Sequence, residues 1–308
     1  MDDHGTQMTW HRLGRIVSAE GQRSWMASHT ACPVPLQIEA SRYRIYFGSR
    51  DGGNHPYIGW IEIDLRNPEA VLAMAETPAL APGEPGYFDD NGVYPSWLVT
   101  ESDRLLLYYM GRSNGEAPRY GMAIGLAESR DGGRSFSRLS PAPIVDRSEY
   151  DPWMVSTPCV LRSGDRWMMW YLSGLRWDMA SGKSYYHIKY AESDDGRSWR
   201  RNGRIAIDFL PGESNIASPA VLRGDDGWQM WYCTFINGGY RIGYARSADG
   251  LSWTRQDDVK GLLPSGAGWD GQGVAYPHVF RHENRTLMVY SGNEFGRAGI
   301  GLAEWIEG

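Results

Sequence analysis

The sequence has little of three things that would assign it to common classes of protein. It has only three cysteines in 308 residues, an odd number that argues against a disulfide framework and suits a reducing compartment. No apolar run approaches the roughly 18 residues of a membrane-spanning helix. The segment Met1–Trp10 is polar and has no signal-peptide core, so we expect a cytoplasmic protein without a membrane partner.

Basic blocks and metal-binding patterns are lacking as well. There are 31 Lys and Arg against 37 Asp and Glu, which gives a net charge of −6 and makes nucleic acid an unexpected partner. No His and Cys cluster has zinc spacing, and no glycine-rich segment joins a strand to a helix as phosphate-binding loops do. We therefore expect no cofactor and no metal site. One alternative concerns His278, which is placed to face an axial water or Ca²⁺ but is more simply a core histidine.

Glycine and large aromatic residues, in contrast, are abundant. The chain has 38 Gly, 14 Trp and 18 Tyr, which indicates many short strands joined by tight turns. An apolar–aromatic triplet recurs at intervals of about 60 residues, and repeats of this length are typical of propellers and solenoids. The five triplets are Ile45–Phe47, Leu107–Tyr109, Met169–Tyr171, Met230–Tyr232 and Met288–Tyr290.

Two further markers keep the same register as the triplets. A proline precedes each triplet, and an isoleucine followed by Gly or Lys comes after it. The prolines are Pro35, Pro95, Pro158, Pro219 and Pro277, and the isoleucines are Ile58, Ile124, Ile188, Ile242 and Ile300. Each unit therefore reads as four strands, with the triplet on the second and the isoleucine on the third.

The repeat predicts an all-β fold, a five-bladed β-propeller with four-stranded antiparallel blades in a single domain. The expected blades cover residues 25–85, 86–146, 147–208, 209–264, and 265–308 together with 8–18. The fifth unit stops after its third strand, while Thr9–Ile16 resembles the fourth strand of the third unit, Ser198–Ile205. The N-terminal strand is therefore predicted to complete the last blade and close the ring.

Three turns between the third and fourth strands share a Ser, Asp, Gly and aromatic pattern. They are Ser129–Phe136, Ser193–Trp199 and Ser247–Trp253, and they resemble the Asp-box turn of sialidases and other propellers. Asp and Ser side chains accept hydrogen bonds from turn backbone, and Gly adopts positive φ. We interpret these turns as structural and not as catalytic.

A functional site is expected on the face where the segments before the inner strands meet the loops between second and third strands. Acidic side chains stand six or seven residues before four of the prolines. We predict Asp90, Asp151 and Glu213 as catalytic acid, base or orienting groups, because paired carboxylates separate acid and base roles. The predicted substrate-binding residues are His29, Asp89, Trp153, Asn215, Asp270, Gln272, Arg112, Arg176, Trp177, His187, Arg241 and Asn293.

Each of these residues also has a structural interpretation. An Asp or Asn before a strand often caps a turn, and an arginine in a neighbouring loop can pair with such a carboxylate. As a functional set, carboxylates flanked by aromatic rings suit sugar chemistry, and the arginines suit an anionic group on the ligand.

Over its whole length the chain resembles the five-bladed β-propeller glycosidase superfamily, which includes arabinanase/xylosidase-like (family 43) and invertase-like enzymes. It resembles most the glycosylase-like proteins of bacterial polysaccharide and natural-product gene clusters. The matching segments are Ser28–His29, Phe88–Ser96, Asp151–Pro152, Trp269–Asp270 and Ser291–Asn293. The resemblance implies a carbohydrate-active pocket at the axis. The acidic triad of family 43 is missing, because Val34, Ser96 and Ser156 stand at its three positions.

The sequence therefore predicts a carbohydrate-active, glycoside hydrolase-like enzyme that acts on a sugar, glycoside or sugar-derived metabolite by carboxylate acid/base chemistry. One alternative is a non-hydrolytic biosynthetic enzyme (a transferase, lyase or cyclase) that reuses the pocket. Others are a sialidase-like enzyme that grips an anionic sugar with arginines, and a binding module without activity.

Overall fold

The computed structural model describes residues 8–116, 118–224 and 226–307, and nearly all of the regular structure is β. The strands are β1 (Met8–Val17), β2 (Ser28–Glu39), β3 (Arg42–Arg50), β4 (Pro56–Asp64), β5 (Asn67–Met74), β6 (Val93–Thr100), β7 (Leu105–Asn114), β8 (Tyr120–Ser129), β9 (Ser137–Arg138), β10 (Met154–Ser163), β11 (Arg166–Trp177), β12 (Ser184–Ser193), β13 (Arg200–Ile207), β14 (Asn215–Gly224), β15 (Gly227–Ile236), β16 (Gly239–Ser247), β17 (Thr254–Arg255), β18 (Ala275–His282), β19 (Arg285–Ser291) and β20 (Ile300–Glu307). Two single-turn helices, α1 (Asp257–Lys260) and α2 (Asn293–Gly296), and a 3-10 turn at Gly268–Asp270 complete the elements. Every helix within the described residues falls short of the length and apolarity that crossing a bilayer would require.

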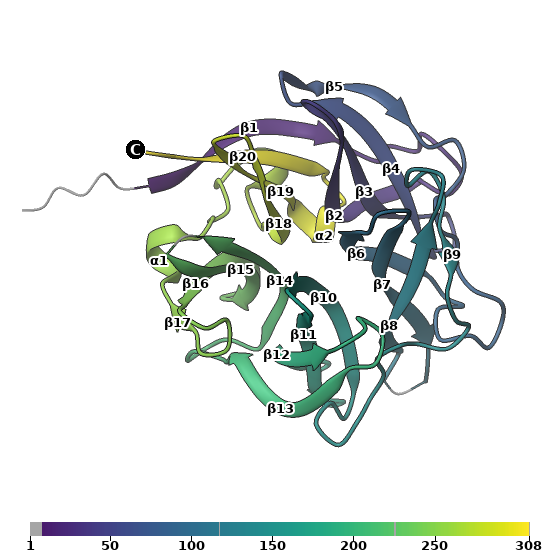
Figure 1. Cartoon of the computed structure of the whole chain (residues 1–308), viewed down its shortest axis with the longest axis vertical. Helices are drawn as coiled ribbons and strands as arrows, with labels where there is room; N and C mark the ends of the chain where they lie inside the picture. Colours follow the sequence, from purple (N-terminus) through teal and green to yellow (C-terminus); the bar gives the residue numbers. More distant parts are fainter. Residues whose placement is uncertain (1–7, 117, 225, 308) are drawn as a thin grey trace, which may run out of the picture.

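Neighbouring strands pair antiparallel in groups of four, which we number along the chain. Groups 1 (β2–β5), 2 (β6–β9) and 5 (β18–β20 with β1) are separate sheets. Groups 3 (β10–β13) and 4 (β14–β17) are joined into one sheet by a single bridge between Tyr186 and Asn215. The first strands of the groups lie around a common centre, as Figure 1 shows, and each contacts the next, with β18 contacting β2. This is the propeller-type β fold that the repeat predicts.

The N-terminal strand lies at the outer edge of group 5. It pairs antiparallel with β20, with Trp10 opposite Trp305 and Arg12 opposite Ala303. The Trp10 ring also packs on Trp231 of group 4, at a centroid distance of 5.8 Å. The chain's first and last strands therefore share one sheet, as the resemblance of residues 9–16 to a fourth strand predicts.

The middle residue of the triplet links each of the first three groups to the following one. Its side chain is fully buried and donates a hydrogen bond to a glycine carbonyl in the next group's Ser–Asp turn. The bonds run from Tyr46 to Gly133 (2.7 Å), from Tyr108 to Gly196 (2.7 Å) and from Trp170 to Gly250 (3.0 Å). The glycines have positive φ, and a Cβ at Gly133 would collide with the Tyr46 hydroxyl. The triplet of one group and the Ser–Asp turn of the next are therefore joined by a buried hydrogen bond.

Within groups 2 to 5, an acidic side chain that precedes the first strand pairs with an arginine of the fourth strand. A tyrosine or threonine of the second strand donates to the same carboxylate. The pairs are Asp89–Arg138, Asp151–Arg201, Glu213–Arg255 and Asp270–Arg12, each at 2.7 Å, and the hydroxyl donors are Tyr109, Tyr171, Thr234 and Tyr290. We call these the acid–arginine clusters. Each cluster joins the segment that leads into the first strand of a group to the fourth strand of the same group.

In groups 4 and 5 the cluster lowers the pKa of its carboxyl group. Burial would raise the pKa of Glu213, but the hydrogen bonds from Arg255, the Leu210 N–H and Thr234 keep it below its usual value. The pKa of Asp270 is lowered in the same way, since Ser265, Arg12 and Tyr290 outweigh the effect of burial. A lowered pKa in the folded state stabilises the fold above the unfolded pKa, and this stability is lost as the pH falls through the folded value.

We predict that Glu213→Gln destabilises the fold by about 1.5–3 kcal/mol at pH 7, because it removes the charge from an acceptor that Arg255, Thr234 and the Leu210 N–H share, while Asp257 still pairs with Arg255. Glu213 has a side-chain exposure of 0%, against 64% for Glu294 in the surface pair with Arg297. Glu294→Gln is the matched control and should change the free energy of unfolding by less than about 1 kcal/mol. Denaturant unfolding at pH 7 and pH 3.5 measures both, and the difference between wild type and Glu213→Gln should shrink at the lower pH. Equal stability of the two variants at pH 7 would contradict a structural cluster.

Deletion of residues 1–18 should strongly lower the melting temperature, because it removes β1, the Arg12–Asp270 pair and the Trp10 contacts. Trp10→Ala alone should cost about 3–5 kcal/mol, the usual penalty for truncating a buried Trp. Thermal unfolding followed by circular dichroism measures both. A truncated chain that melts at the wild-type temperature would show that β1 is dispensable.

Candidate functional site

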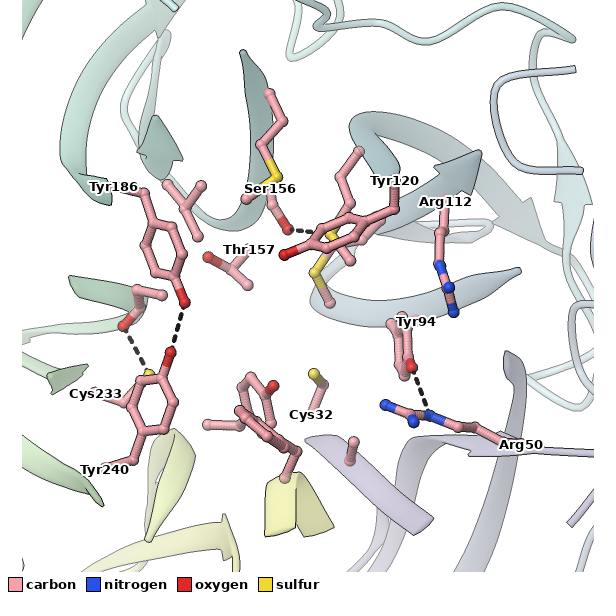
Figure 2. Close-up of a pocket in the computed structure, with 18 of the residues that line it drawn as sticks. Cys32, Arg50, Tyr94, Arg112, Tyr120, Ser156, Thr157, Tyr186, Cys233 and Tyr240 are labelled. Carbon is pink, nitrogen blue, oxygen red and sulfur yellow. Dashed lines mark hydrogen bonds between the residues drawn. The ribbon is translucent and has the colours of Figure 1, made fainter. Parts of the chain in front are cut away.

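A cavity of about 290 Å³ opens where the first strands of the groups converge, and every group contributes to its wall. The lining residues, most of them drawn in Figure 2, are Ala31, Cys32, Arg50, Asn54, Tyr94, Met110, Arg112, Tyr120, Met122, Met154, Ser156, Thr157, Leu172, Tyr186, Ala217, Cys233, Tyr240, Tyr276 and Phe295. We call this cavity the central pocket. Aromatic rings, thioethers and two guanidinium groups dominate its wall.

The floor of the central pocket is made by a β-bulge that recurs in the first strands. Strand pairing skips a step between Ser156 and Cys159 in β10, and the same shift occurs in β2, β14 and β18. At each bulge the residue before a proline has positive φ, namely Cys32 (55°), Thr157 (40°), Ser218 (54°) and Tyr276 (54°). This conformation is strained for a residue other than glycine. Bulges re-aim side chains, and these four line the axis.

The strand pairing around the bulge differs from the alignment of the five repeats that the proline spacing predicts. Val34, Trp97 and Cys159 are the residues that pair with the middle of the triplet in groups 1 to 3. The position equivalent to Pro158 is therefore held by Pro33 and by Ser96, and not by Pro35 and Pro95. The proline spacing failed because the shifted pairing cannot be read from the sequence alone.

The strand register decides which residues line the axial cavities at the three family 43 positions named above. Val34 is 1% exposed and packs in the core, while Cys32 lines the central pocket instead. Ser96 donates to the Pro158 carbonyl at 2.8 Å in a smaller axial cavity. Ser156 lines the central pocket and contacts the Met122 sulfur at 3.3 Å.

The acidic residues predicted as catalytic are not brought to the central pocket. Asp151 and Glu213 lie in acid–arginine clusters inside groups 3 and 4. Asp90 is half-buried and accepts a hydrogen bond from the Gly86 N–H at 2.9 Å. Among the residues that the structure describes, no Asp or Glu lines the central pocket. Within the described part of the chain, Asp151 and Glu213 point into their own sheets, where an arginine pairs with each, and Asp90 accepts from a turn backbone N–H.

Most of the predicted substrate-binding residues also lie outside the central pocket, and only Arg112 lines it. Trp153 and Trp177 line a second cavity, and Asp89 and Asp270 lie in acid–arginine clusters. The others form local contacts: His29 with Ser28, Asn215 with Ser184, Arg176 with the Tyr185 ring, His187 with Asp208, and Asn293 with the backbone N–H of Gln272. Arg241 is half-buried, and its Nε has no partner within the described part of the chain.

Sequence reasoning missed the tyrosines of the central pocket. Tyr94, Tyr120, Tyr186, Tyr240 and Tyr276 all line it. A usable signal was present, because Tyr186 and Tyr240 each stand two residues before the isoleucine marker of a third strand. In groups 2 to 4 the residue at that position, Met122, Tyr186 or Tyr240, lines the central pocket.

The two pocket arginines lie on either side of Tyr94 (Figure 2). Arg50 donates from Nε to the Tyr94 hydroxyl at 3.0 Å and from Nη1 to Asn54 at 3.1 Å. The Arg112 guanidinium lies over the Tyr120 ring, 6.0 Å from its centroid. In the part of the chain that the structure describes, neither arginine has a carboxylate partner. This side of the pocket is therefore positively charged and unneutralised.

The pKa of His29 is affected by the same positive charge. Burial, together with Arg50 and Arg297, lowers the pKa of His29 to about 4. The ring is consequently neutral at pH 7 and acts as a hydrogen-bonding group. An anion bound beside Arg50 would offset the charge that depresses this pKa.

The opposite side of the central pocket carries a pair of phenols. The hydroxyls of Tyr186 and Tyr240 lie 2.5 Å apart (Figure 2). Burial raises the pKa of both, so both are protonated at neutral pH. Burial also raises the pKa of Cys32 and Cys233, which keeps these thiols protonated and poorly nucleophilic. The proton donors of this pocket are therefore phenols and thiols.

His278 lines a smaller axial cavity of about 20 Å³ below the central pocket. Its ring stacks on Trp97 with a centroid distance of 4.2 Å, and burial lowers its pKa to about 3. A space of this size suits one water molecule. The described residues contain no group of three or more His, Cys, Asp or Glu arranged to hold a metal ion.

The fold matches solved structures of propeller-type glycoside hydrolases. One glycoside hydrolase aligns with a TM-score of 0.73 and 18% identity, covering 97% of this protein and 92% of that one. A thermostable family-43 glycoside hydrolase aligns with a TM-score of 0.62 and 16% identity, covering 90% and 88%. The endo-arabinase of Bacteroides thetaiotaomicron VPI-5482 aligns with a TM-score of 0.61 and 14% identity, covering 95% and 97%. At these identities the likeness establishes the fold alone, and with it the predicted resemblance to this superfamily's fold is confirmed.

Sequence comparison gives a nearer relative. No protein-family model matches the chain. The uncharacterized protein MT1551 of Mycobacterium tuberculosis (strain CDC 1551 / Oshkosh) is 38% identical over 297 residues, which cover 96% of this chain and 99% of that protein. The chain therefore belongs to the same family as MT1551, and this family has the propeller-type fold of glycoside hydrolases.

Proposed function

We propose that the protein is a carbohydrate-active enzyme whose central pocket binds a sugar or sugar-derived ligand with an anionic group. In this proposal Arg50 and Arg112 hold the anion, and the aromatic wall contacts the sugar ring. The scaffold is a five-bladed ring in which each group of strands is one blade and β1 closes the last.

The observation that carries this proposal is the imbalance of charge in the central pocket. Two arginines face the cavity without a carboxylate partner among the described residues, and no acidic side chain lines the wall. A guanidinium binds a carboxylate or phosphate through two parallel hydrogen bonds, so a wall with two unneutralised arginines suits a ligand that brings such an anion. The fold shared with glycoside hydrolases supports a sugar as the carrier of that anion.

The chemistry that this pocket supports differs from the paired-carboxylate mechanism of glycosidases. That mechanism needs two acidic side chains beside the bond that breaks. The central pocket offers the Tyr186–Tyr240 phenol pair instead, which can donate a proton to a leaving oxygen. This favours the second candidate function, a non-hydrolytic transferase, lyase or cyclase that acts on an anionic sugar.

Arg112→Ala should weaken the binding of anionic sugars at least about 30-fold, the lower range for truncating one partner of a buried charge pair. Isothermal titration with glucuronate, galacturonate, N-acetylneuraminate and glucose 1-phosphate measures the effect, with glucose and galactose as neutral counterparts. Arg197→Ala is the matched control, because Arg197 is an exposed arginine outside the pocket. Equal affinity for neutral and anionic sugars in the wild type would contradict the proposal.

Tyr240→Phe should lower turnover by at least about 10²-fold, the usual contribution of a positioned proton donor. A chromatographic assay of p-nitrophenyl uronides and of uronate disaccharides detects hydrolysis, transfer and elimination products in one experiment. Glu213→Gln, assayed where circular dichroism shows it folded, should keep its rate within a few-fold. Loss of activity in Glu213→Gln with full activity in Tyr240→Phe would reinstate the acidic residues as catalytic.

A further inference from the structure

A second cavity of about 570 Å³ lies beside the central pocket, between groups 2 and 3. Its wall includes Tyr120 and Met122, which also line the central pocket. The two cavities therefore share the part of their walls that these two side chains form.

Four aromatic residues line this second cavity, and three of them, beside Phe88, form a packed cluster. Tyr120, Trp153 and Trp177 contact one another edge to face or at a tilt, with centroid distances of 5.9, 5.8 and 5.3 Å. Trp153 is 8% exposed, whereas Trp177 is half-buried and lines the cavity from the end of β11. Met179 near it is 64% exposed. The cluster is an aromatic surface that is partly open to solvent.

Polar side chains surround the aromatic wall. Ser113 and Asn114 from the end of β7 lie on one side, and Asp146 and Arg147 follow from the connection before group 3. The charges of Asp146 and Arg147 cancel, in contrast with the unpaired arginines of the central pocket. Aromatic faces with a few amide, hydroxyl and balanced charged groups suit a neutral ligand that has both apolar faces and many hydroxyls.

Resting on the proposed function, we propose that the second cavity is a subsite for a neutral sugar unit linked to the anionic unit in the central pocket. The ligand is then an oligosaccharide or glycoside of at least two units. Its anionic unit lies against Arg50 and Arg112, and its neutral unit stacks on Trp177. Both cavity volumes fall near the range of roughly 300–1,000 Å³ that small-molecule sites occupy.

The test compares one ligand unit with two. Isothermal titration with glucuronate and with an aldobiuronic acid (glucuronate linked to a neutral hexose or pentose) gives the ratio of their affinities. In the wild type the disaccharide should bind at least 10-fold more tightly than the monosaccharide. Trp177→Ala should bring the ratio close to one. Trp177→Leu, which keeps apolar bulk and guards against unfolding, should reduce it to an intermediate value.

Leu263→Ala is the surface control, since Leu263 is an exposed apolar residue outside both cavities and should leave the ratio unchanged. A wild-type ratio near one, with glucuronate still bound, would overturn the second subsite and leave the proposed function standing. A ratio that Trp177→Ala and Leu263→Ala change equally would also overturn it. A protein that binds neither sugar, nor the other anionic sugars, would overturn the proposed function itself.

Discussion

A buried acid paired with an arginine of the outermost strand recurs in four of the five strand groups. In groups 2 to 5 it joins the two edges of one sheet, from the connection at the axis to the strand at the periphery. Each pair supplies charge-assisted hydrogen bonds to a buried carboxylate, so each cluster favours a single arrangement of its group. In group 5 the arginine comes from β1, and the cluster therefore also fixes the first strand to the last sheet.

The same pairing determines the chemistry of the central pocket. The four acids that precede the first strands of groups 2 to 5 are paired inside the sheets, and the pocket wall has no carboxylate among the described residues. The remaining charges there are Arg50 and Arg112, and the remaining proton donors are buried phenols and thiols. A pocket with this composition is suited to an anion and unsuited to catalysis by a pair of carboxylates. The strained bulge residues, Cys32, Thr157 and Tyr276, complete its floor.

The sequence predicts the strand groups well because their signals are local and repeated. The triplets mark the buried second strands, and the resemblance of residues 9–16 to a fourth strand anticipates the pairing of β1 with β20. The candidate site is predicted poorly, because it depends on contacts between distant residues. Asp151 meets Arg201, and Asp270 meets Arg12, across separations that no local pattern reveals.

One sequence signal could have shown the structural role of these acids. Arg138, Arg201, Arg255 and Arg12 each stand two residues after an aromatic at the start of a fourth strand. An arginine that recurs in the same register as a buried acid indicates a pair within each repeat. The positions of the bulges, in contrast, follow from strand pairing, and their effect on Cys32 and Val34 emerges only in three dimensions.

A crystal structure of the protein with an anionic sugar such as glucuronate bound tests most directly whether the two pocket arginines hold the ligand. We expect the carboxylate of the ligand within hydrogen-bonding distance of both Arg50 and Arg112, with its ring against the tyrosines of the central pocket. Asp151 and Glu213 should remain paired with Arg201 and Arg255. A ligand held by Asp151 or Glu213, or bound away from the two pocket arginines, would contradict this binding mode.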